Sequence, residues 1–434
     1  MGIVPITIIL FGGMVILLFM GVPAVFAIGG MSIILTFLLR GPTALYTVAS
    51  TTYGTMTDVT LLAIPMFTLM ASFLIKSGIA DRLFQTLSYW LSGISGGLAI
   101  VTIIVSTVLA MCGGFGPGII TMCLIAIPAM LKRGYNKSLT LGSVIAGGLL
   151  GDVIPPSTIM IIFGFINRLS VGKLFIAGII PGLILALSHV LNIWLRCRLN
   201  PKLAPRVAGD ITWNMRLLSL REVILPVVLV FTILGSIFLG IATPTEAASV
   251  GALGALLCCV VNRTICWKLV REAGKETFKI TGVVLWIMIA ATFFGVFYTS
   301  VGARELILEL VLTLPVNPWV IIGGMQIILI VLGMFLDDYA IVIIVSPIFL
   351  PIATTLGFDP IWFAIVFILN MQLAELSPPF GWALIVVRAM TNPKEITTGE
   401  IWRAVPPFAL IQLLALIMVI VVPSLALWLP DKMI

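Results

Sequence analysis

The sequence predicts an all-α membrane protein that crosses the bilayer many times. Hydrophobic residues make up 61% of the 434 residues and charged residues only 9%, so most of the chain must lie in lipid. The apolar runs have the length of helices and are interrupted by glycine and proline. One interrupted segment also occurs twice, at the constant offset that separates Pro128 from Pro351.

The apolar runs, taken in order, indicate where the helices lie. The first run lacks a basic n-region and a cleavage site, so we expect a retained span and not a signal peptide. The runs predict helices at residues 3–22, 24–39, 59–77, 97–112, 115–131, 137–152, 157–166, 174–197, 222–241, 243–262, 279–299, 319–335, 339–356, 361–375, 380–389 and 402–428.

The repeated segment contains a proline, a glycine, an acidic residue and a Pro-Pro pair in the same register. In a membrane protein, paired Gly- or Pro-interrupted apolar segments in corresponding halves indicate the substrate and ion site of a secondary transporter. The equivalent pairs are Pro128/Pro351, Gly134/Gly357, Asp152/Glu375, Pro155/Pro378 and Pro156/Pro379.

Two pairs of predicted helices are short enough to enter and leave the membrane on one side. Residues 97–112 would reach roughly 24 Å as a helix, against roughly 30 Å of hydrocarbon. The next helix, 115–131, follows a glycine-rich turn. The helices at 319–335 and 339–356 form a second pair of this kind. We therefore predict two re-entrant hairpins.

The basic residues predict the orientation of the chain. We place the N-terminus outside, make both hairpins re-entrant and let both Pro-Pro segments span the membrane. Of the 24 Lys and Arg residues, 19 then lie in cytoplasmic loops. The five outside are Arg40, Arg168, Lys173, Arg304 and Lys432. The first hairpin opens to the cytoplasm and the second to the outside, so the two copies are inverted, as expected for alternating access.

The sequence argues against two other classes of protein. The net charge of +7 could indicate a nucleic-acid partner, but the basic residues lie in short loops between apolar runs. No segment resembles a nucleotide-binding P-loop, so we do not expect this chain to hydrolyse ATP.

These patterns divide the chain into two repeats, a linker and further spans. The predicted parts are N-terminal scaffold spans at 1–58; a first repeat at 59–197 with its hairpin at 97–131 and broken helix at 137–166; a cytoplasmic linker at 198–221; scaffold spans at 222–278; and a second repeat at 279–434 with its hairpin at 319–357 and broken helix at 361–389.

The two Pro-Pro breaks predict binding chemistry. Proline has no N–H to donate and clashes with the preceding turn, so each helix ends there. Carbonyls left without partners at bilayer depth need a cavity, water or a cation. The helix N-termini that follow, from Ser157 and Phe380, carry partial positive charge and suit a substrate carboxylate. The alternative is that both pairs are packing kinks only.

Four acidic residues fall at the breaks and at the second hairpin tip. Asp152 and Glu375 each stand three residues before a Pro-Pro pair, and Asp337 and Asp338 occupy the tip. A charge at the bilayer centre costs roughly 2.5–3.5 kcal/mol, so each should face a cavity or a partner. Cation coordination and proton coupling are the functional interpretations. The structural interpretation is that each acid is a neutral carboxyl group that hydrogen-bonds unpaired backbone groups at the break.

At these residues the chain resembles the large membrane subunit of TRAP transporters, the tripartite ATP-independent periplasmic transporters. The resemblance runs in family order over nearly the whole chain. It implies an elevator transporter, in which hairpins and broken helices move as one body past a scaffold, and Na⁺-coupled import of a small carboxylate or other organic acid. The matching segments are Leu62–Phe67, Lys132–Tyr135, Ile154–Ser157, Phe175–Gly182, Ala242–Ala248 and Gly333–Asp337.

The resemblance also implies the ion and substrate residues. It implies no catalytic residue, no cofactor and no metal other than Na⁺. One sodium site would use Cys112, Gly113, Phe115, Gly151, Val153 and Pro155, and a second would use Gly333, Asp337, Ser377 and Pro378. We expect substrate contacts from Gly114, Pro156, Ser157, Asp338, Glu375, Pro379 and Phe380.

The chain departs from the family pattern at both sites. The first tip often reads Ser-Gly-Ser-Ser in sialic-acid members, whereas Cys112 is followed here by Gly-Gly-Phe. The second break often reads Thr-Pro-Pro-Val-Gly, and here Ser377 is followed by Pro-Pro-Phe-Gly. These changes permit backbone ligation and put side-chain ligation in doubt. They are closer to the branch that handles 2-oxo acids and other small carboxylates.

The resemblance implies a bacterial inner-membrane location and two protein partners. These are a small four-helix membrane subunit, expected as a separate chain, and a periplasmic substrate-binding protein. Two alternatives stay open: a stand-alone transporter of the wider elevator superfamily, and a membrane enzyme that uses Asp337 and Asp338 as a metal-binding acid pair. The sequence does not identify the carboxylate.

Overall fold

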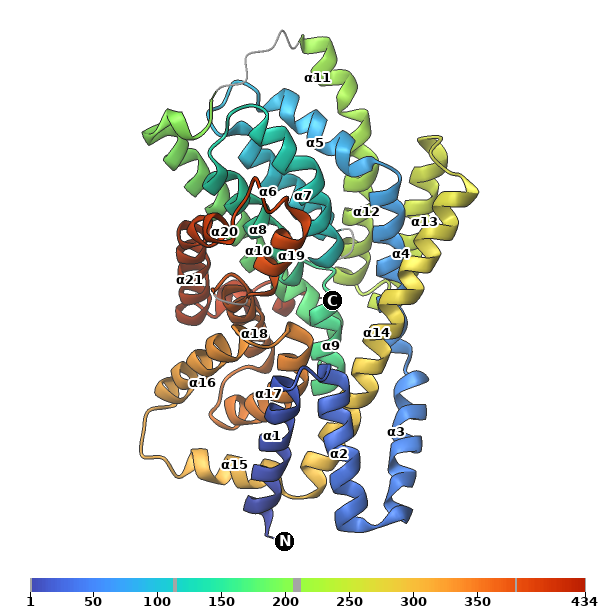
Figure 1. The fold of residues 1–434 in the computed structure, drawn as a ribbon. Helices are drawn as coiled ribbons and strands as arrows, with labels where there is room; N and C mark the ends of the chain where they lie inside the picture. Colours follow the sequence, from blue (N-terminus) through green and yellow to red (C-terminus); the bar gives the residue numbers. More distant parts are fainter. Residues whose placement is uncertain (1, 112–114, 206–211, 379–380, 434) are drawn as a thin grey trace.

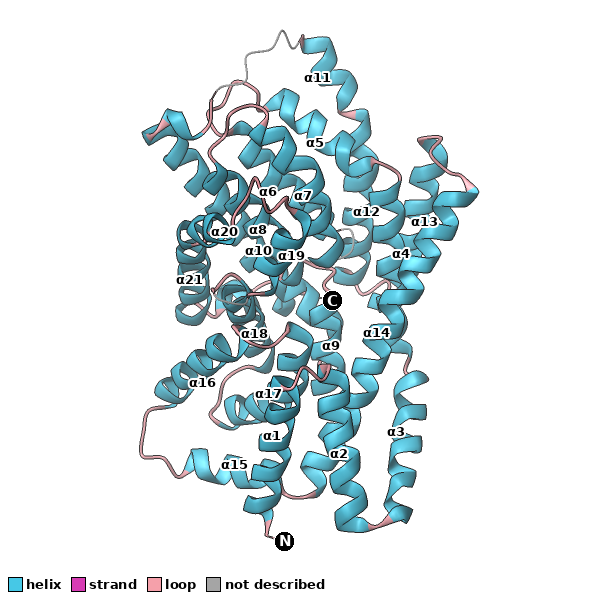
Figure 2. Cartoon of the chain, in the orientation of Figure 1, coloured by secondary structure: helices cyan, strands magenta, loops and turns pink. Residues whose placement is uncertain are grey.

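The structure is a computed structural model that describes residues 2–111, 115–205, 212–378 and 381–433. Figure 2 shows that the regular elements in these ranges are helices, with no strand among them. The all-α prediction is therefore confirmed for the described part of the chain.

The helices vary widely in length. The α-helices are α1 (Ile3–Phe19), α2 (Ala24–Arg40), α3 (Tyr46–Met56), α4 (Ala63–Lys76), α5 (Ile79–Trp90), α6 (Gly97–Ala110), α7 (Phe115–Leu131), α8 (Lys137–Leu149), α9 (Thr158–Asn167), α10 (Val171–Leu199), α11 (Trp213–Ser219), α12 (Arg221–Phe238), α13 (Pro244–Val261), α14 (Trp267–Ser300), α15 (Ala303–Leu312), α16 (Pro318–Gly333), α17 (Asp338–Thr355), α18 (Pro360–Glu375), α19 (Trp382–Met390), α20 (Thr398–Ala404), α21 (Pro406–Val421) and α22 (Ser424–Leu427). The 3₁₀ turns are η1 (Pro42–Leu45), η2 (Val59–Leu62), η3 (Leu150–Asp152), η4 (Pro201–Leu203) and η5 (Pro430–Lys432).

The lengths of the helices agree with a membrane location. Within the described residues, 7 helical segments are long and apolar enough to cross a bilayer. They are Val59–Lys76, Val171–Leu199, Trp213–Phe238, Pro244–Val261, Trp267–Ser300, Asp338–Thr355 and Thr398–Val421. Shorter apolar helices, among them α6, α16 and α18, supplement them.

One side of the molecule is built around α14, which runs diagonally in Figure 1. α14 packs against α2, α3 and α4, and α13 packs against both α4 and α12. These helices come from the regions that the sequence predicts as scaffold and from the first span of each predicted repeat.

The other side contains two helical hairpins and two interrupted helices. The first hairpin, α6 and α7, packs against α8, while the second hairpin, α16 and α17, packs against α18. The segment after each interruption crosses over: α9 contacts α17, and α19 contacts α7. In Figure 1 the first hairpin lies in the upper half of the molecule and the second in the lower half. The two halves are therefore interlocked.

The structure contains helices that the hydropathy pattern missed. α3, α5, α11 and α15 are short or carry charged residues, so they contain no long apolar run. α5 and α15 each follow a glycine with positive φ, Gly78 at 77° and Gly302 at 76°. A left-handed backbone favours glycine, which has no Cβ. α5 connects α4 to the first hairpin, and α15 connects α14 to the second.

Several predicted helix boundaries are wrong. The helix expected at 279–299 begins three turns earlier, at Trp267, because its polar first part has no apolar signature. The helix expected at 402–428 is divided into α20, α21 and α22, with prolines at 406 and 423 next to the interruptions. The predicted linker 198–221 also contains η4 and α11.

Candidate functional site

The first interruption lies between α8 and α9. α8 ends at Leu149, η3 follows, and the Pro155-Pro156 pair precedes Ser157. The Ser157 hydroxyl oxygen accepts a hydrogen bond from the Met160 N–H at 3.4 Å and caps α9. The two prolines cannot continue the helical hydrogen bonds, so α9 begins as a new helix.

The predicted ligands of the first interruption are all buried. Gly151, Val153, Pro155, Pro156 and Ser157 lie in one buried stretch.

This stretch packs against glycines of α10. A Cβ on Gly178 would lie 2.3 Å from the Val153 carbonyl oxygen, and a Cβ on Gly182 would lie 2.5 Å from Ile154 Cγ1. No alanine side chain fits such distances without a shift. The two glycines therefore let the α10 backbone support the interruption directly.

The second interruption follows Glu375. Ser377 and Pro378 are half-buried, and the Ser377 hydroxyl donates to the Leu373 carbonyl at 2.8 Å. The chain returns close to the end of α18, because a Cβ on Gly381 would lie 2.1 Å from the Glu375 carbonyl oxygen. α19 starts at Trp382.

The second hairpin tip contacts this interruption. A Cβ on Gly333 would lie 2.4 Å from Ala374 Cβ, so the end of α16 touches the end of α18. The adjacent acids have different environments. Asp337 is exposed, and its Oδ1 accepts from the Ala340 N–H at 2.7 Å as the cap of α17. Asp338 is buried.

Some predicted site residues lie outside the described part of the chain. They are Cys112, Gly113 and Gly114 of the first tip, and Pro379 and Phe380 of the second break. Phe115 is the first residue of α7. The assignments to these residues stay predictions.

Three of the four predicted acids meet. Ligand oxygens of Asp152, Asp338 and Glu375 all lie within 4.8 Å of one another, and the three residues are buried. They come from η3, α17 and α18, so they join the first interruption, the second hairpin and the second interruption. Asp337 is not part of this group. Asp152 and Glu375, which are equivalent in the repeat, lie side by side.

Sequence reasoning missed a set of buried amides next to this group. Gln372 on α18 donates through Nε2 to the Leu149 carbonyl at the end of α8. Gln412 on α21 in turn donates to Gln372 Oε1 at 2.9 Å. Asn370 donates to Gln326 Oε1 at 2.6 Å and so connects α18 with α16. The rule that singled out the acids, a polar group within an apolar span, would also have found these amides.

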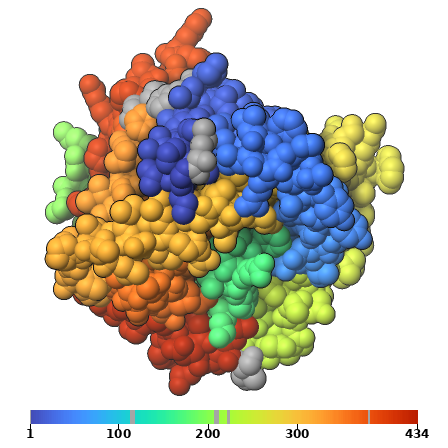
Figure 3. Space-filling view, turned by 90° about the horizontal axis from the view of Figure 1, so that it is seen from below, coloured from blue at the N-terminus to red at the C-terminus, as the bar shows by residue number. Residues whose placement is uncertain are grey.

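A large cavity of about 1230 Å³ separates α14 from α9 and α17. Its polar lining includes Asp58, Arg168 and Arg304, together with hydroxyls of Thr299 and Ser300. Figure 3, a view from below, shows the green chain near the end of α9 next to the blue N-terminal helices and the amber segment that holds α15. Both arginines belong to the five basic residues that the sequence places outside.

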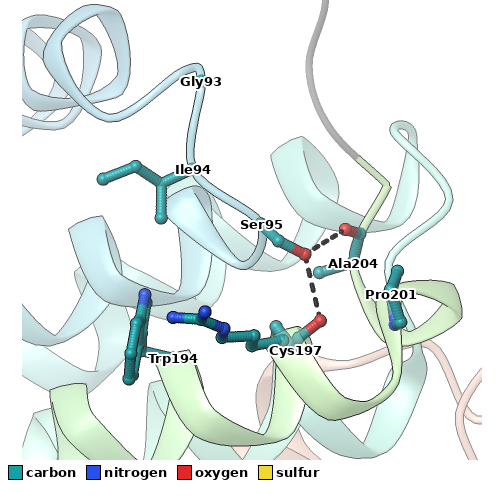
Figure 4. A pocket seen from close by; sticks show the side chains of 8 residues that line it. Gly93, Ile94, Ser95, Trp194, Cys197, Pro201 and Ala204 are labelled. Carbon is teal, nitrogen blue, oxygen red and sulfur yellow. Dashed lines mark hydrogen bonds between the residues drawn. The ribbon is translucent and has the colours of Figure 1, made fainter.

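A smaller cavity of about 530 Å³ lies at the other end of the molecule, between the α5–α6 turn and the end of α10. Figure 4 shows Ser95 directed at the backbone oxygens of Cys197 and Ala204, at 3.2 and 3.3 Å. These contacts attach the turn to α10.

Comparisons with known proteins agree with this architecture. Residues 11–425 match the family model described as "Tripartite ATP-independent periplasmic transporter, DctM component". The chain is 35% identical over 409 residues to the C4-dicarboxylate TRAP transporter large permease protein DctM of Pseudomonas aeruginosa, with 93% of each chain covered.

Other relatives are named for different substrates. The sialic acid TRAP transporter large permease protein SiaM of Vibrio cholerae is 31% identical, with 96% of each chain covered. The isethionate TRAP transporter permease protein DctMQ of Oleidesulfovibrio alaskensis is 30% identical over 96% of this chain and 65% of its own length.

A solved structure shares the fold. MtrF of Neisseria gonorrhoeae superposes with a TM-score of 0.64 at 14% identity, over 90% of this chain and 85% of that one. Because the family model covers nearly the whole sequence, the chain belongs to the tripartite ATP-independent periplasmic transporter family as its DctM component, a multi-pass membrane permease.

Proposed function

We propose that this chain is the permease of a Na⁺-coupled importer for a small carboxylate or related organic acid. The observation that carries the proposal is the interlocked pair of hairpins and interrupted helices, in which both interruptions and the second tip meet in the interior. A membrane protein retains interrupted helices at depth where they line a binding site, since loose backbone groups need partners.

The relatives support an acidic substrate. Three of them are named for C4-dicarboxylate, sialic acid and isethionate, which are organic anions, and a fourth is named for ectoine, a zwitterion that also carries a carboxylate. The buried start of α9 at Ser157 offers a helix N-terminus to an anion, together with Pro156. The cavity of about 1230 Å³, which we call the outer cavity because Arg168 and Arg304 are among the basic residues predicted to lie outside, would add these two arginines to the route of the substrate. The remaining substrate contacts proposed here are Gly114, Asp338, Glu375, Pro379 and Phe380.

Sodium is the proposed coupling ion, and no other cofactor is required. One site would lie between the first tip (Cys112, Gly113, Phe115) and the first interruption (Gly151, Val153, Pro155), and the other would use Gly333, Asp337, Ser377 and Pro378. The second set is supported by the close contact of Gly333 with α18 and by the exposure of Asp337. Carbonyl and carboxylate oxygens suit a hard cation.

The movement proposed is of the elevator type. The two hairpins, which we take to be re-entrant, and the two interrupted helices would move together past α4, α12, α13 and α14. α5 and α15 each bridge between these two groups, and each begins at a glycine with positive φ. The outer cavity lies between the groups, where such sliding would open and close it.

Two partners are proposed: a small membrane subunit and a periplasmic substrate-binding protein, with the complex in the bacterial inner membrane. The family is tripartite by name, and the isethionate relative has a combined name, DctMQ, and a longer chain than this one covers. Uptake that proceeds with this chain alone would favour the stand-alone alternative.

The decisive experiment is uptake of labelled carboxylates into proteoliposomes that contain the complex. We expect uptake only with an inward Na⁺ gradient and with the binding protein present. Two Na⁺ carried with a monocarboxylate would move one net charge, roughly 2.3 kcal/mol per 100 mV, so an inside-negative potential should accelerate it. With a dicarboxylate the same stoichiometry is electroneutral. Uptake that is indifferent to Na⁺ would refute the coupling.

A further inference from the structure

The carboxylates of Asp152, Asp338 and Glu375 form a group that the proposed sodium sites do not use. Their exposed fractions are 3%, 6% and 2%, and their ligand oxygens converge within 4.8 Å. Asp152 and Glu375 are equivalent in the two repeats, and Asp338 follows the second tip. The group therefore lies where three parts of the interlocked fold touch.

The second observation is that each acid has an oxygen without a partner. Asp152 Oδ2, Asp338 Oδ1 and Glu375 Oε2 are buried and have no hydrogen-bond partner among the described residues. The described ion pairs, such as Lys76 with Glu276, lie elsewhere. Asp338 and Glu375 also hydrogen-bond to each other, which one shared proton allows, but no described cationic side chain neutralises the charge that remains, so the group needs another source of positive charge.

We propose that Asp152, Asp338 and Glu375 bind one hard, oxygen-preferring metal cation that joins the two repeats. Three converging carboxylate oxygens are the ligands that Ca²⁺ takes at 2.3–2.6 Å, and Na⁺ shares this preference for oxygen. Oxygens no more than 4.8 Å apart can all reach an ion of this size. Cysteine and histidine do not belong to the group, which argues against zinc.

The cation has a structural consequence and a consequence for the substrate. It would hold η3, α17 and α18 together, so that both repeats move as one body. It would also let Asp338 and Glu375 face a substrate anion through the metal, since bare carboxylates repel an anion.

The test is thermal unfolding of the purified full-length protein, stripped of metal and then titrated with CaCl₂ or NaCl at constant ionic strength. In one of the two salts, the wild-type unfolding midpoint should rise by about 5 °C at roughly 100 times the dissociation constant. Glu375→Gln and Asp152→Asn should each weaken this response at least about 10-fold. Without metal both variants should unfold at or above the wild-type temperature, because one like charge is removed.

Two controls separate this site from the proposed coupling sites. Asp337→Asn should keep the response of the unfolding midpoint to CaCl₂, and should lose only the part of the NaCl response that comes from the second proposed sodium site, even if it abolishes Na⁺-driven uptake. Glu309 is an exposed acid on α15, and Glu309→Gln should change neither the metal response of the unfolding midpoint nor Na⁺-driven uptake. If only Na⁺ acts, the ion is monovalent; if only Ca²⁺ acts, it is divalent.

The proposal is overturned if neither salt stabilises the wild type, which would mean that protons alone neutralise the group. It is also overturned if Glu375→Gln and Asp152→Asn need the same salt concentration as the wild type for half of the rise in unfolding temperature. Should one variant fail to fold, the amount of ⁴⁵Ca²⁺ or ²²Na⁺ bound by the other variant, compared with the amount bound by the wild type, decides the question. Uptake that fails to depend on Na⁺ would refute the proposed function and leave this result standing.

Discussion

Gln372 donates a hydrogen bond to the carbonyl oxygen of Leu149, and the two residues are 223 positions apart, the offset of the sequence repeat. The sequence predicts that the two copies are inverted, and equivalent positions of such copies touch only near the axis that relates them. The same offset separates Asp152 from Glu375, which also lie side by side. These contacts would place the predicted pseudo-symmetry axis between the ends of α8 and α18, next to both interruptions.

This contact predicts that Gln372→Leu destabilises the protein. The Leu149 carbonyl would lose its side-chain donor, and Gln412 would lose one of its two acceptors and keep the Leu369 carbonyl; an unsatisfied buried group costs about 1–3 kcal/mol. We expect a clearly lower thermal unfolding midpoint in detergent. Gln372→Glu, which keeps the size and removes the donor, should be similarly harmful, whereas Gln85→Leu on the surface should have little effect. Equal midpoints for Gln372→Leu and Gln85→Leu would contradict this role.

Gly178→Ala should disturb the first interruption. The new methyl would lie 2.3 Å from the Val153 carbonyl oxygen and 2.5 Å from Met160 Cε, so the backbone of the break must move. Overpacking of this kind costs about 1–3 kcal/mol. Gly172→Ala on the same helix is the control, since its nearest neighbour would be 3.4 Å away. Gly178→Ala should have a lower unfolding midpoint and a lower uptake rate than Gly172→Ala, which should behave as the wild type. If Gly178→Ala also behaves as the wild type, the packing argument fails.

Gly96→Ala should destabilise the turn between α5 and α6. Gly96 has φ of 80°, and a Cβ there would lie 2.7 Å from Cys197 Sγ. The left-handed conformation alone costs an alanine about 1–2 kcal/mol. Gly93, at the top of the same turn in Figure 4, should tolerate alanine, because a Cβ at that position would have no neighbouring atom within 4 Å. Circular dichroism melts of the two variants would check the difference.

The outer cavity predicts a role for two arginines in substrate entry. Arg168→Gln and Arg304→Gln should each raise the KM for an anionic substrate about 3- to 10-fold with little change in maximal rate, because attraction and not translocation is weakened. The effect should shrink as salt is added. Lys173→Gln, exposed nearby in sequence and not part of the cavity lining, is the matched control. An unchanged KM in both arginine variants would argue against an anion route through this cavity.

The membrane class, the repeat and most long helices were readable from the sequence, because these features depend on local runs of apolar residues and on proline. The amphipathic helices α5 and α15 were not, since they contain no run of apolar residues long enough to be noticed. The polar start of α14 escaped for the same reason. Their signal was the glycine before each, Gly78 and Gly302, whose left-handed backbone ends one helix and starts the next.

For the candidate site, the sequence by itself determined the chemistry present: the Pro-Pro breaks, the acids placed three residues before them, and the acids of the second tip. Only the tertiary structure decided which of these residues meet. Asp337 and Asp338 are neighbours in the chain, yet one caps α17 at an exposed position and the other joins Asp152 and Glu375 in the interior. Proline and charge act through the local backbone and solvation, whereas the meeting of the three acids depends on the packing of α18 against both α17 and η3.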